Sequence, residues 1–224
     1  MAVPWMEKML WGVGGVCLVL PVLSVVFTVR LFFLKQEAHR SLLRRPADVV
    51  AIFYFFFNLG LVSYIVDLEQ VVIRDPSDAA EVANVRWPPQ KMIALIHWYG
   101  RNYDPVLMAR PPWWRATIWL DVLFYGPFYV VAIFAFARGK SWIRLPTIVY
   151  CSSILTGVFV ILLEETFGQH KTPHWHLVML LNAPWVLLPA TLLTRMLLFE
   201  HPFGQKGGQK TPIGNIKKNN KKTS

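Results

Sequence analysis

Two aspartates lie in stretches of sequence that are otherwise apolar. Asp67 ends the run 49–66, and Asp121 lies a short way inside the run 116–137. An ionised carboxylate that faces hydrocarbon is costly, so each side chain needs a partner, water or a chemical role. Two carboxyl groups close together in a low-dielectric site tend to share one proton. Such a pair could bind a cationic amphiphile, or it could move a proton onto and off an apolar substrate.

The apolar segments around these aspartates define the class of protein. Hydrophobic residues make up 54% of the 224 residues. A bilayer core about 30 Å thick needs about 20 apolar residues per helix. The segments that meet this requirement are residues 9–34, 49–72, 116–137, 145–163 and 175–199. The sequence therefore predicts an all-α, polytopic transmembrane bundle of about five helices, in which the first segment is retained rather than cleaved as a signal peptide.

The expected domain organisation follows from these segments. Residues 1–47 would form an N-terminal transmembrane helix and a basic cytoplasmic loop, residues 48–200 a four-helix membrane domain, and residues 201–224 a disordered basic cytoplasmic tail. Basic residues gather between the first two segments, between the third and fourth, and in the tail, which predicts that these regions face the cytosol. The N-terminus would then be lumenal and the C-terminus cytosolic.

The tail carries a lysine pair with a further predicted role. Lys221 and Lys222 are the fourth and third residues from the end, the pattern of a dilysine retrieval signal on cytosolic tails. We therefore predict residence in the endoplasmic reticulum membrane, with coat machinery as a partner at these lysines. The net charge of +10 lies mostly beside the membrane segments and in the tail, which favours anionic lipid headgroups over nucleic acid.

The predicted topology brings the two aspartates to one depth. The second segment ends near Asp67 at the lumenal surface, and the third enters from the lumen, so Asp121 lies about six residues, or about 9 Å, below that surface. The last segment brings Asn182 and Trp185 to a similar depth. We expect an apolar, aromatic pocket whose ligand-binding residues are Asp67, Asp121, Tyr64, Trp119, Tyr125, Asn182 and Trp185, with Phe124, Phe128 and Tyr129 as further wall residues.

The polar residues allow two interpretations other than a ligand pocket. In the first, Asp67 only lies at the interface and Asp121 pairs with Arg115 or with another helix; the spacing alone leaves this open. In the second, the cluster formed by His170, His174, His176, Glu164 and Glu165 binds zinc. No motif of known ligand spacing supports zinc, so we expect no metal and no cofactor.

Several stretches resemble the sigma-2 receptor branch of the EXPERA family. They are residues 96–107 (IHWYGRNYDPVL), 110–114 (RPPWW), 120–122 (LDV) and 136–150 (FARGKSWIRLPTIVY). Asp67 also falls where that branch carries its first membrane aspartate, and Asp104 matches its aspartate in the lumenal segment. For Asp104 we expect a structural role, accepting hydrogen bonds from neighbouring backbone, Arg101 or Arg110.

Other features resemble the sterol isomerase of the same family, the emopamil-binding protein. They are the additional first helix and residues 181–189 (LNAPWVLLP). The resemblance implies an endoplasmic reticulum bundle with a pocket for sterols and cationic amphiphiles. In the isomerase, acidic groups protonate a ring alkene and remove a proton elsewhere. By this match Asp67 and Asp121 stand where the isomerase has glutamates, and Ser63 where it has a histidine, which favours binding over catalysis.

These observations predict a multi-pass membrane protein that binds a sterol or related lipid, and cationic amphiphiles, in a lumen-side pocket, with a role in sterol and lipid homeostasis. The first alternative is a sterol double-bond isomerase with Asp67 and Asp121 as catalytic residues, and the second is a membrane scaffold or trafficking partner. The expected partners are the lipid ligand and the membrane, with a second copy of the chain as a further candidate and no nucleic acid.

Overall fold

The computed structural model describes residues 42–203, and every element in this range is helical. In chain order the elements are η1 (Leu42–Arg44), α2 (Pro46–Phe57), η2 (Asn58–Asp67), α3 (Leu68–Val72), α4 (Ala79–Asn84), α5 (Gln90–Asn102), α6 (Pro105–Ala109), α7 (Pro112–Leu120), η3 (Asp121–Tyr125), α8 (Gly126–Ala137), η4 (Ser141–Ile143), α9 (Arg144–Phe167) and α10 (Trp175–Leu198). The predicted first membrane segment (9–34) and the lysine pair Lys221 and Lys222 lie outside the described residues.

Four continuous helical stretches are long and apolar enough to cross a membrane. They are Pro46–Val72, Pro112–Ala137, Ser141–Phe167 and Trp175–Leu198. This confirms the predicted all-α membrane bundle over the described part of the chain. Three of these stretches begin three or four residues before the predicted segments, at Pro46, Pro112 and Ser141. Proline is favoured in the first turn of a helix, where its missing N–H costs no hydrogen bond.

Two of these membrane helices contain a π-helical segment, and each segment carries one of the aspartates. Asp67 is the last residue of η2, between α2 and α3, and Asp121 is the first residue of η3, between α7 and α8. In a π-helix the backbone bonds join residues five apart, so each turn holds an extra residue and the side chains that follow are rotated. Such segments are rare and are frequent at functional sites.

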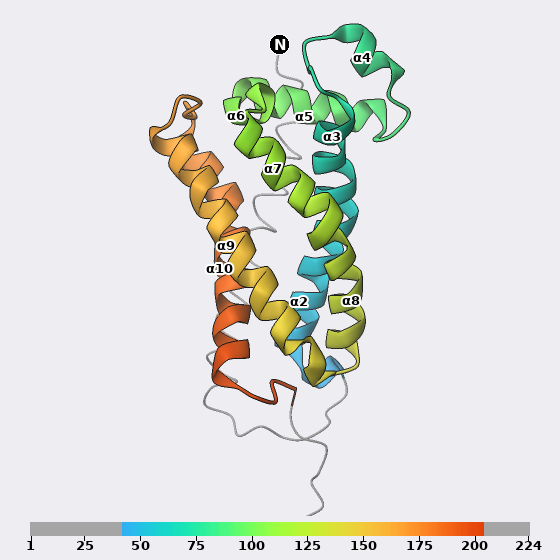
Figure 1. Ribbon diagram of the computed structural model, residues 1–224, viewed down its shortest axis with the longest axis vertical. Coiled ribbons are helices and arrows are strands. Elements are labelled where there is room, and N and C mark those ends of the chain that lie inside the picture. Colours follow the sequence, from blue (N-terminus) through green and yellow to red (C-terminus); the bar gives the residue numbers. More distant parts are fainter. Residues whose placement is uncertain (1–41, 204–224) are drawn as a thin grey trace, which may run out of the picture.

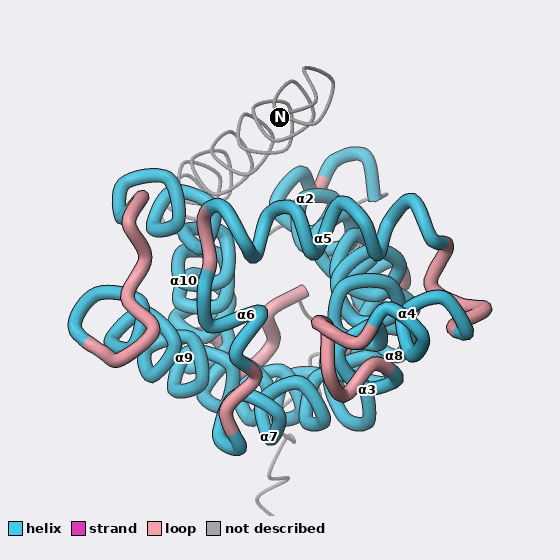
Figure 2. Tube along the Cα trace, turned by 90° about the horizontal axis from the view of Figure 1, so that it is seen from above, coloured by secondary structure: helices cyan, strands magenta, loops and turns pink. Residues whose placement is uncertain are grey.

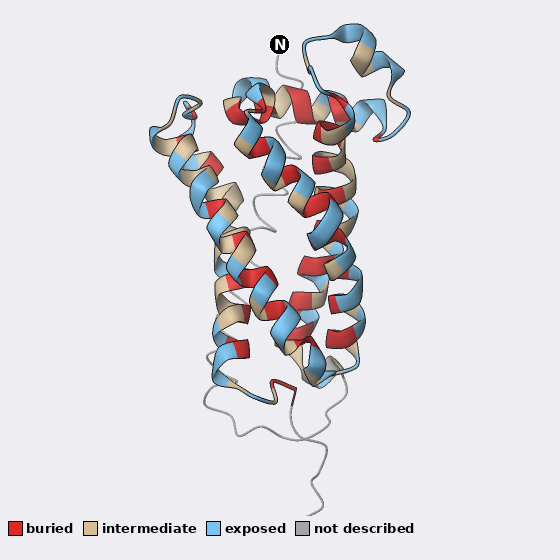
Figure 3. Ribbon diagram, viewed as in Figure 1, coloured by how far each residue is buried: buried red, intermediate tan, exposed pale blue. Residues whose placement is uncertain are grey.

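The helices pack in two antiparallel pairs. Helix α2 lies along α8, and α9 lies along α10 (Figure 1). The short helices α5 and α6 lie across one end of the bundle, which we call the cap end, as the view along the bundle axis also shows (Figure 2). Buried positions follow the inward faces of the long helices, while much of their outer surface is exposed (Figure 3). Exposed apolar side chains on that surface include Phe56, Leu145 and Val149, as expected for helices that face lipid.

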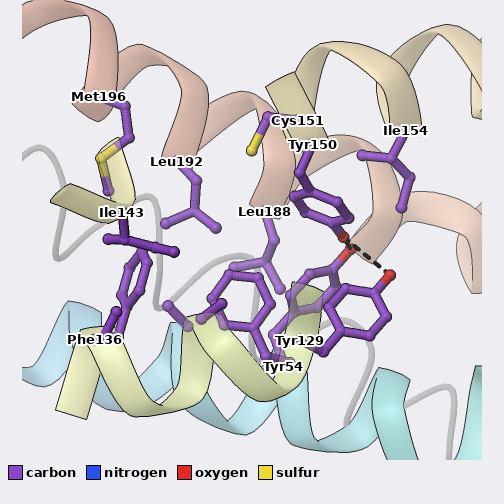
Figure 4. Packing of buried hydrophobic residues seen from close by; sticks show 14 of the residues in the cluster. Tyr54, Tyr129, Phe136, Ile143, Tyr150, Cys151, Ile154, Leu188, Leu192 and Met196 are labelled. Carbon is purple, nitrogen blue, oxygen red and sulfur yellow. Dashed lines mark hydrogen bonds between the residues drawn. The ribbon is translucent and has the colours of Figure 1, made fainter. Parts of the chain in front are cut away.

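The half of the bundle away from the cap end is densely packed with aromatic and aliphatic side chains. Phe55 of α2 contacts the rings of Tyr129 and Phe136 of α8 at centroid distances of 6.0 and 5.3 Å. Leu188 and Met196 of α10 complete this core (Figure 4). Because this half is filled, the cavity described below lies toward the cap end.

Candidate functional site

The two aspartates predicted from the sequence are brought together inside the bundle. Asp67 is 7% exposed and Asp121 is 8% exposed, and their charges interact. The hydroxyl of Ser63, on η2, donates a hydrogen bond to Asp121 Oδ1 across the two π-helical segments. For Asp67, in contrast, the described residues provide no hydrogen-bond partner. Asp67 is therefore the carboxyl group that is free to meet a ligand.

A cavity of about 180 Å³ lies beside these carboxyl groups. Its lining comes from all four membrane helices and from α6, and consists of Val62, Val66, Asp67, Gln70, Leu107, Trp114, Thr117, Ile118, Leu120, Asp121, Tyr125, Ile154, Gly157, Val158, Ile161, Asn182 and Trp185. Most of these side chains are apolar or aromatic. A concave, mainly apolar site with a few polar groups is the usual form of a small-molecule site.

The polar side chains at the wall are oriented by hydrogen bonds. Trp114 Nε1 donates to Gln70 Oε1 at 2.6 Å, and Trp185 Nε1 donates to the buried Asn58 Oδ1 at 2.7 Å. Asn182 Nδ2 donates to the carbonyl of Val178 at 3.0 Å. The two indole N–H groups are thus already satisfied, so their rings present apolar faces to the cavity.

Five of the seven predicted ligand-binding residues line this cavity, namely Asp67, Asp121, Tyr125, Asn182 and Trp185. The placement of the other two in the wall is corrected. Trp119 lies on the outer face of α7 and is 48% exposed, because it is one residue beyond the inward-facing Ile118. Tyr64 lies outside the lining, and its carbonyl accepts a hydrogen bond from Trp87 Nε1 at 2.9 Å.

The further aromatic residues expected in the wall also lie elsewhere. Phe124 is exposed on the outer surface, and Phe128 and Tyr129 belong to the packed core. The hydroxyl of Tyr150 lies 3.0 Å from that of Tyr54 and 3.2 Å from that of Tyr129 (Figure 4). This hydroxyl cluster satisfies polar atoms in the core below the cavity.

Helix α9 contributes a wall that the sequence reasoning missed. Ile154, Gly157, Val158 and Ile161 recur at helical spacing and line the cavity. A Cβ added at Gly157 would meet no atom within 4 Å. The absence of a side chain there leaves room for a ligand, and the signal that could have found it is a glycine on the buried stripe of a membrane helix.

Of the partners that the first alternative named for Asp121, Arg115 is wrong, whereas a contact with another helix is present, because Ser63 of η2 donates to Asp121. Arg115 is exposed, and its Nη2 donates to the carbonyl of Arg74 at 2.7 Å. The predicted arginine partners of Asp104 are also corrected. Arg101 is exposed, and Arg110 pairs with Glu69 instead.

Glu69, His97 and Arg110 form a buried ion-pair cluster that the sequence reasoning did not anticipate. Arg110 Nη2 lies 2.9 and 2.8 Å from the two carboxylate oxygens of Glu69, and His97 Nε2 lies 2.8 Å from Glu69 Oε1. Arg110 adopts a left-handed conformation with φ 47°, which ends α6. The cluster ties α3, α5 and the end of α6 together directly above the cavity.

Asp104 lies at the start of α6 and is 5% exposed. Burial raises the pKa of Asp104 to about 6, and hydrogen bonds from the backbone N–H groups of Leu107 and Val106 oppose that rise. The structural role expected for Asp104 stays a prediction. In the segment expected to be lumenal, Glu164 Oε1 lies 2.8 Å from His170 Nδ1.

Comparison with known proteins adds to this geometry. The model of the EXPERA (expanded EBP) superfamily matches residues 91–196. The protein named sigma intracellular receptor 2 from Xenopus tropicalis is 31% identical over 156 residues, which cover 65% of this chain and 85% of that protein. The protein of the same name from Homo sapiens is 33% identical over 123 residues, which cover 49% of this chain and 70% of that protein. The matched range 91–196 includes Asp121, Asn182 and Trp185 and begins after Asp67.

Proposed function

Because this chain belongs to the EXPERA family, we propose that it binds a sterol or related lipid, or a cationic amphiphile, in the cavity between its membrane helices. The observation that carries this proposal is the unpartnered, buried Asp67 at the wall of a mainly apolar cavity. We place the protein in the endoplasmic reticulum membrane with a role in sterol and lipid homeostasis, on the basis of the family and the predicted retrieval signal at Lys221 and Lys222.

The chemistry of the wall suits a rigid apolar molecule with one polar or cationic end. Aliphatic side chains of α9 and the aromatic residues Trp114, Tyr125 and Trp185 offer apolar contact area. Burying that area contributes about 25 cal/mol per Å² to binding. Asp67 would accept a hydrogen bond from a hydroxyl group or pair with an ammonium group, and nearby aromatic faces would stabilise a cation further.

The direct test is to identify lipid that copurifies with the protein by mass spectrometry and to compare wild type with Gly157→Phe. The phenyl ring would fill space that the glycine leaves open, so we expect the Gly157→Phe protein to retain about a fifth of the lipid or less, since a ligand forced into the overfilled site would cost about 1–3 kcal/mol. The matched control is Val149→Phe, which adds a ring on the exposed face of the same helix. Equal lipid occupancy in all three proteins would contradict the proposal.

The second candidate function is sterol double-bond isomerisation, which the adjacency of Asp67 and Asp121 at the cavity favours. One carboxyl group would protonate the ring alkene, and the other would remove a proton from a neighbouring carbon, so the double bond moves without net change in composition. Against this function, Asp121 is engaged by Ser63, and aspartate is one methylene shorter than glutamate. We therefore rank binding first.

Complementation separates the two functions. We expect that wild type does not restore growth to cells lacking their own sterol isomerase, because no imidazole stands at Ser63 to support proton transfer. Sterol analysis by mass spectrometry in the same cells is the measurement. Restored growth with the shifted sterol product, lost in Asp67→Asn and in Asp121→Asn, would make isomerisation the main function.

A further inference from the structure

Two buried carboxyl groups at the cap end take no part in the cavity. Asp104 lies directly before α6, and Glu165 lies in the last turn of α9, where it is 1% exposed. Asp104 Oδ1 and Glu165 Oε2 are both buried without a hydrogen-bond partner among the described residues. Buried acceptors are normally paired with a hydrogen-bond donor. Two unpaired carboxyl oxygens in one region therefore indicate that each of them lacks a donor.

Backbone contacts place these two groups on either side of one residue. The hydroxyl of Thr172 donates to the carbonyl of Tyr103 at 2.5 Å, and the N–H of Thr172 donates to the carbonyl of Glu165 at 2.9 Å. Tyr103 directly precedes Asp104. The two hydrogen bonds of Thr172 therefore hold the backbone beside Asp104 near the backbone of Glu165. Their charges act on each other, and the phenol of Tyr99, from α5, interacts with both.

Within residues 42–203, no cation is placed to compensate the pair. Arg110 is bound to Glu69, and Arg101 and Lys171 are exposed. On the α9 side, the neighbouring Glu164 and His170 pair with each other. His174, which precedes α10, is exposed and contacts the ring of Tyr103 at a centroid distance of 5.0 Å.

We propose that Asp104 and Glu165 share one proton in a carboxyl–carboxylate hydrogen bond that latches the cap helices α5 and α6 to α9. A proton bound to one acid turns that carboxyl group into a hydrogen-bond donor for the other acid, so both unpaired oxygens gain a partner. The same proton also removes one of the two buried negative charges. The raised pKa of Asp104, about 6, agrees with this arrangement. Release of the proton to solvent as the pH rises above this pKa leaves two negative charges in a buried site and opens the latch.

The proposed hydrogen bond can affect the cavity because Asp104 and Glu165 each lie close in sequence to a residue of the cavity wall. Leu107 lies three residues after Asp104, and Ile161 lies four residues before Glu165, and both line the cavity. In this proposal the shared proton links the start of α6 to the end of α9 beside the ligand space. Loss of the shared proton would let the cap-end wall between α6 and α9 separate.

Infrared spectroscopy of the full chain in detergent tests the shared proton. We expect a carbonyl band of a protonated carboxyl group that disappears both in Asp104→Asn and in Glu165→Gln, because either change removes a member of the same pair. The control Glu164→Gln, at the adjacent residue, should keep the band. If the two variants remove different bands, or remove none, the pair does not share a proton.

Thermal unfolding between about pH 4 and about pH 8, on both sides of the raised pKa of Asp104, provides a second, independent measurement. The wild-type midpoint should fall with rising pH as the shared proton leaves. In Glu165→Gln the amide donates permanently to Asp104, so the fall should be smaller, while Glu165→Ala, which offers no donor, should unfold at a lower temperature than Glu165→Gln throughout. Identical pH slopes in wild type and Glu165→Gln, or equal midpoints for the Gln and Ala variants, would overturn the latch.

Discussion

At the scale of single residues, the two aspartates of the cavity differ in what surrounds them. Asp121 accepts a hydrogen bond from Ser63, whereas Asp67 has no hydrogen-bond partner among the described residues although it is almost fully buried. A buried acceptor without a donor is costly, and that cost is recovered when a ligand supplies the donor. The two carboxyl groups should therefore contribute unequally to binding.

We predict that Asp67→Asn lowers the affinity for a cationic amphiphile by about 100-fold or more, because removing one partner of a desolvated ion pair commonly costs about 3–5 kcal/mol. Asp121→Asn should have a smaller effect, since Ser63 already satisfies that side chain. Equilibrium binding of a radiolabelled cationic amphiphile to the purified protein measures both. The matched control is Asp78→Asn in an exposed segment, where asparagine keeps the capping hydrogen bonds of α4. Unchanged affinity in Asp67→Asn would move the site elsewhere.

At the scale of elements, buried ion pairs hold the helices together at both ends of the bundle. At the end away from the cap, Asp48 of α2 pairs with Arg45 at 2.8 Å and with Arg195 of α10 at 2.5 Å. At the cap end, Glu69 of α3 pairs with Arg110 after α6. In both places an arginine also donates to backbone carbonyls, such as that of Ile73 for Arg110. These clusters fix the register of helices whose apolar faces alone would allow sliding.

We predict that Arg110→Met destabilises the protein by about 3–5 kcal/mol, because it leaves the buried Glu69 without its countercharge. The double variant Arg110→Met/Glu69→Gln should recover part of this loss, since the uncompensated charge is then gone. The free energy of unfolding in a denaturant titration of the detergent-solubilised protein is the measurement. A double variant less stable than Arg110→Met would show that packing rather than charge dominates at this site.

At the scale of the whole molecule, the two ends of the bundle differ in the sign of their charged residues. Arg45, Arg138, Lys140 and Arg144 lie at or near the ends of α2, α8 and α9 that are away from the cap. The segments around α4, α5 and α6 mix both signs. From the positive-inside rule we predict that the end away from the cap faces the cytosol and that the cap end faces the lumen.

We therefore predict that, in intact endoplasmic reticulum vesicles, a tag after Ser224 is digested by added protease and a tag before Met1 is protected. The five-segment topology, with the segment 9–34 as a membrane helix, requires the two termini to lie on opposite sides. Solubilising the vesicles should expose both tags equally, which controls for intrinsic resistance to cleavage. Digestion of both tags in intact vesicles would contradict the topology.

The sequence by itself determined the fold class and the four described membrane helices, because long apolar runs in a membrane satisfy their backbone polar groups as helices. It also predicted that Asp67 and Asp121 lie close together, since charges within such runs need a polar site. It further indicated Tyr125, Asn182 and Trp185 as residues of the cavity wall. Tertiary structure alone decided the rest of the wall. The rotation introduced by η2 and η3, the Arg110 partner of Glu69 and the open space at Gly157 depend on how helices distant in the sequence pack, which no local periodicity encodes.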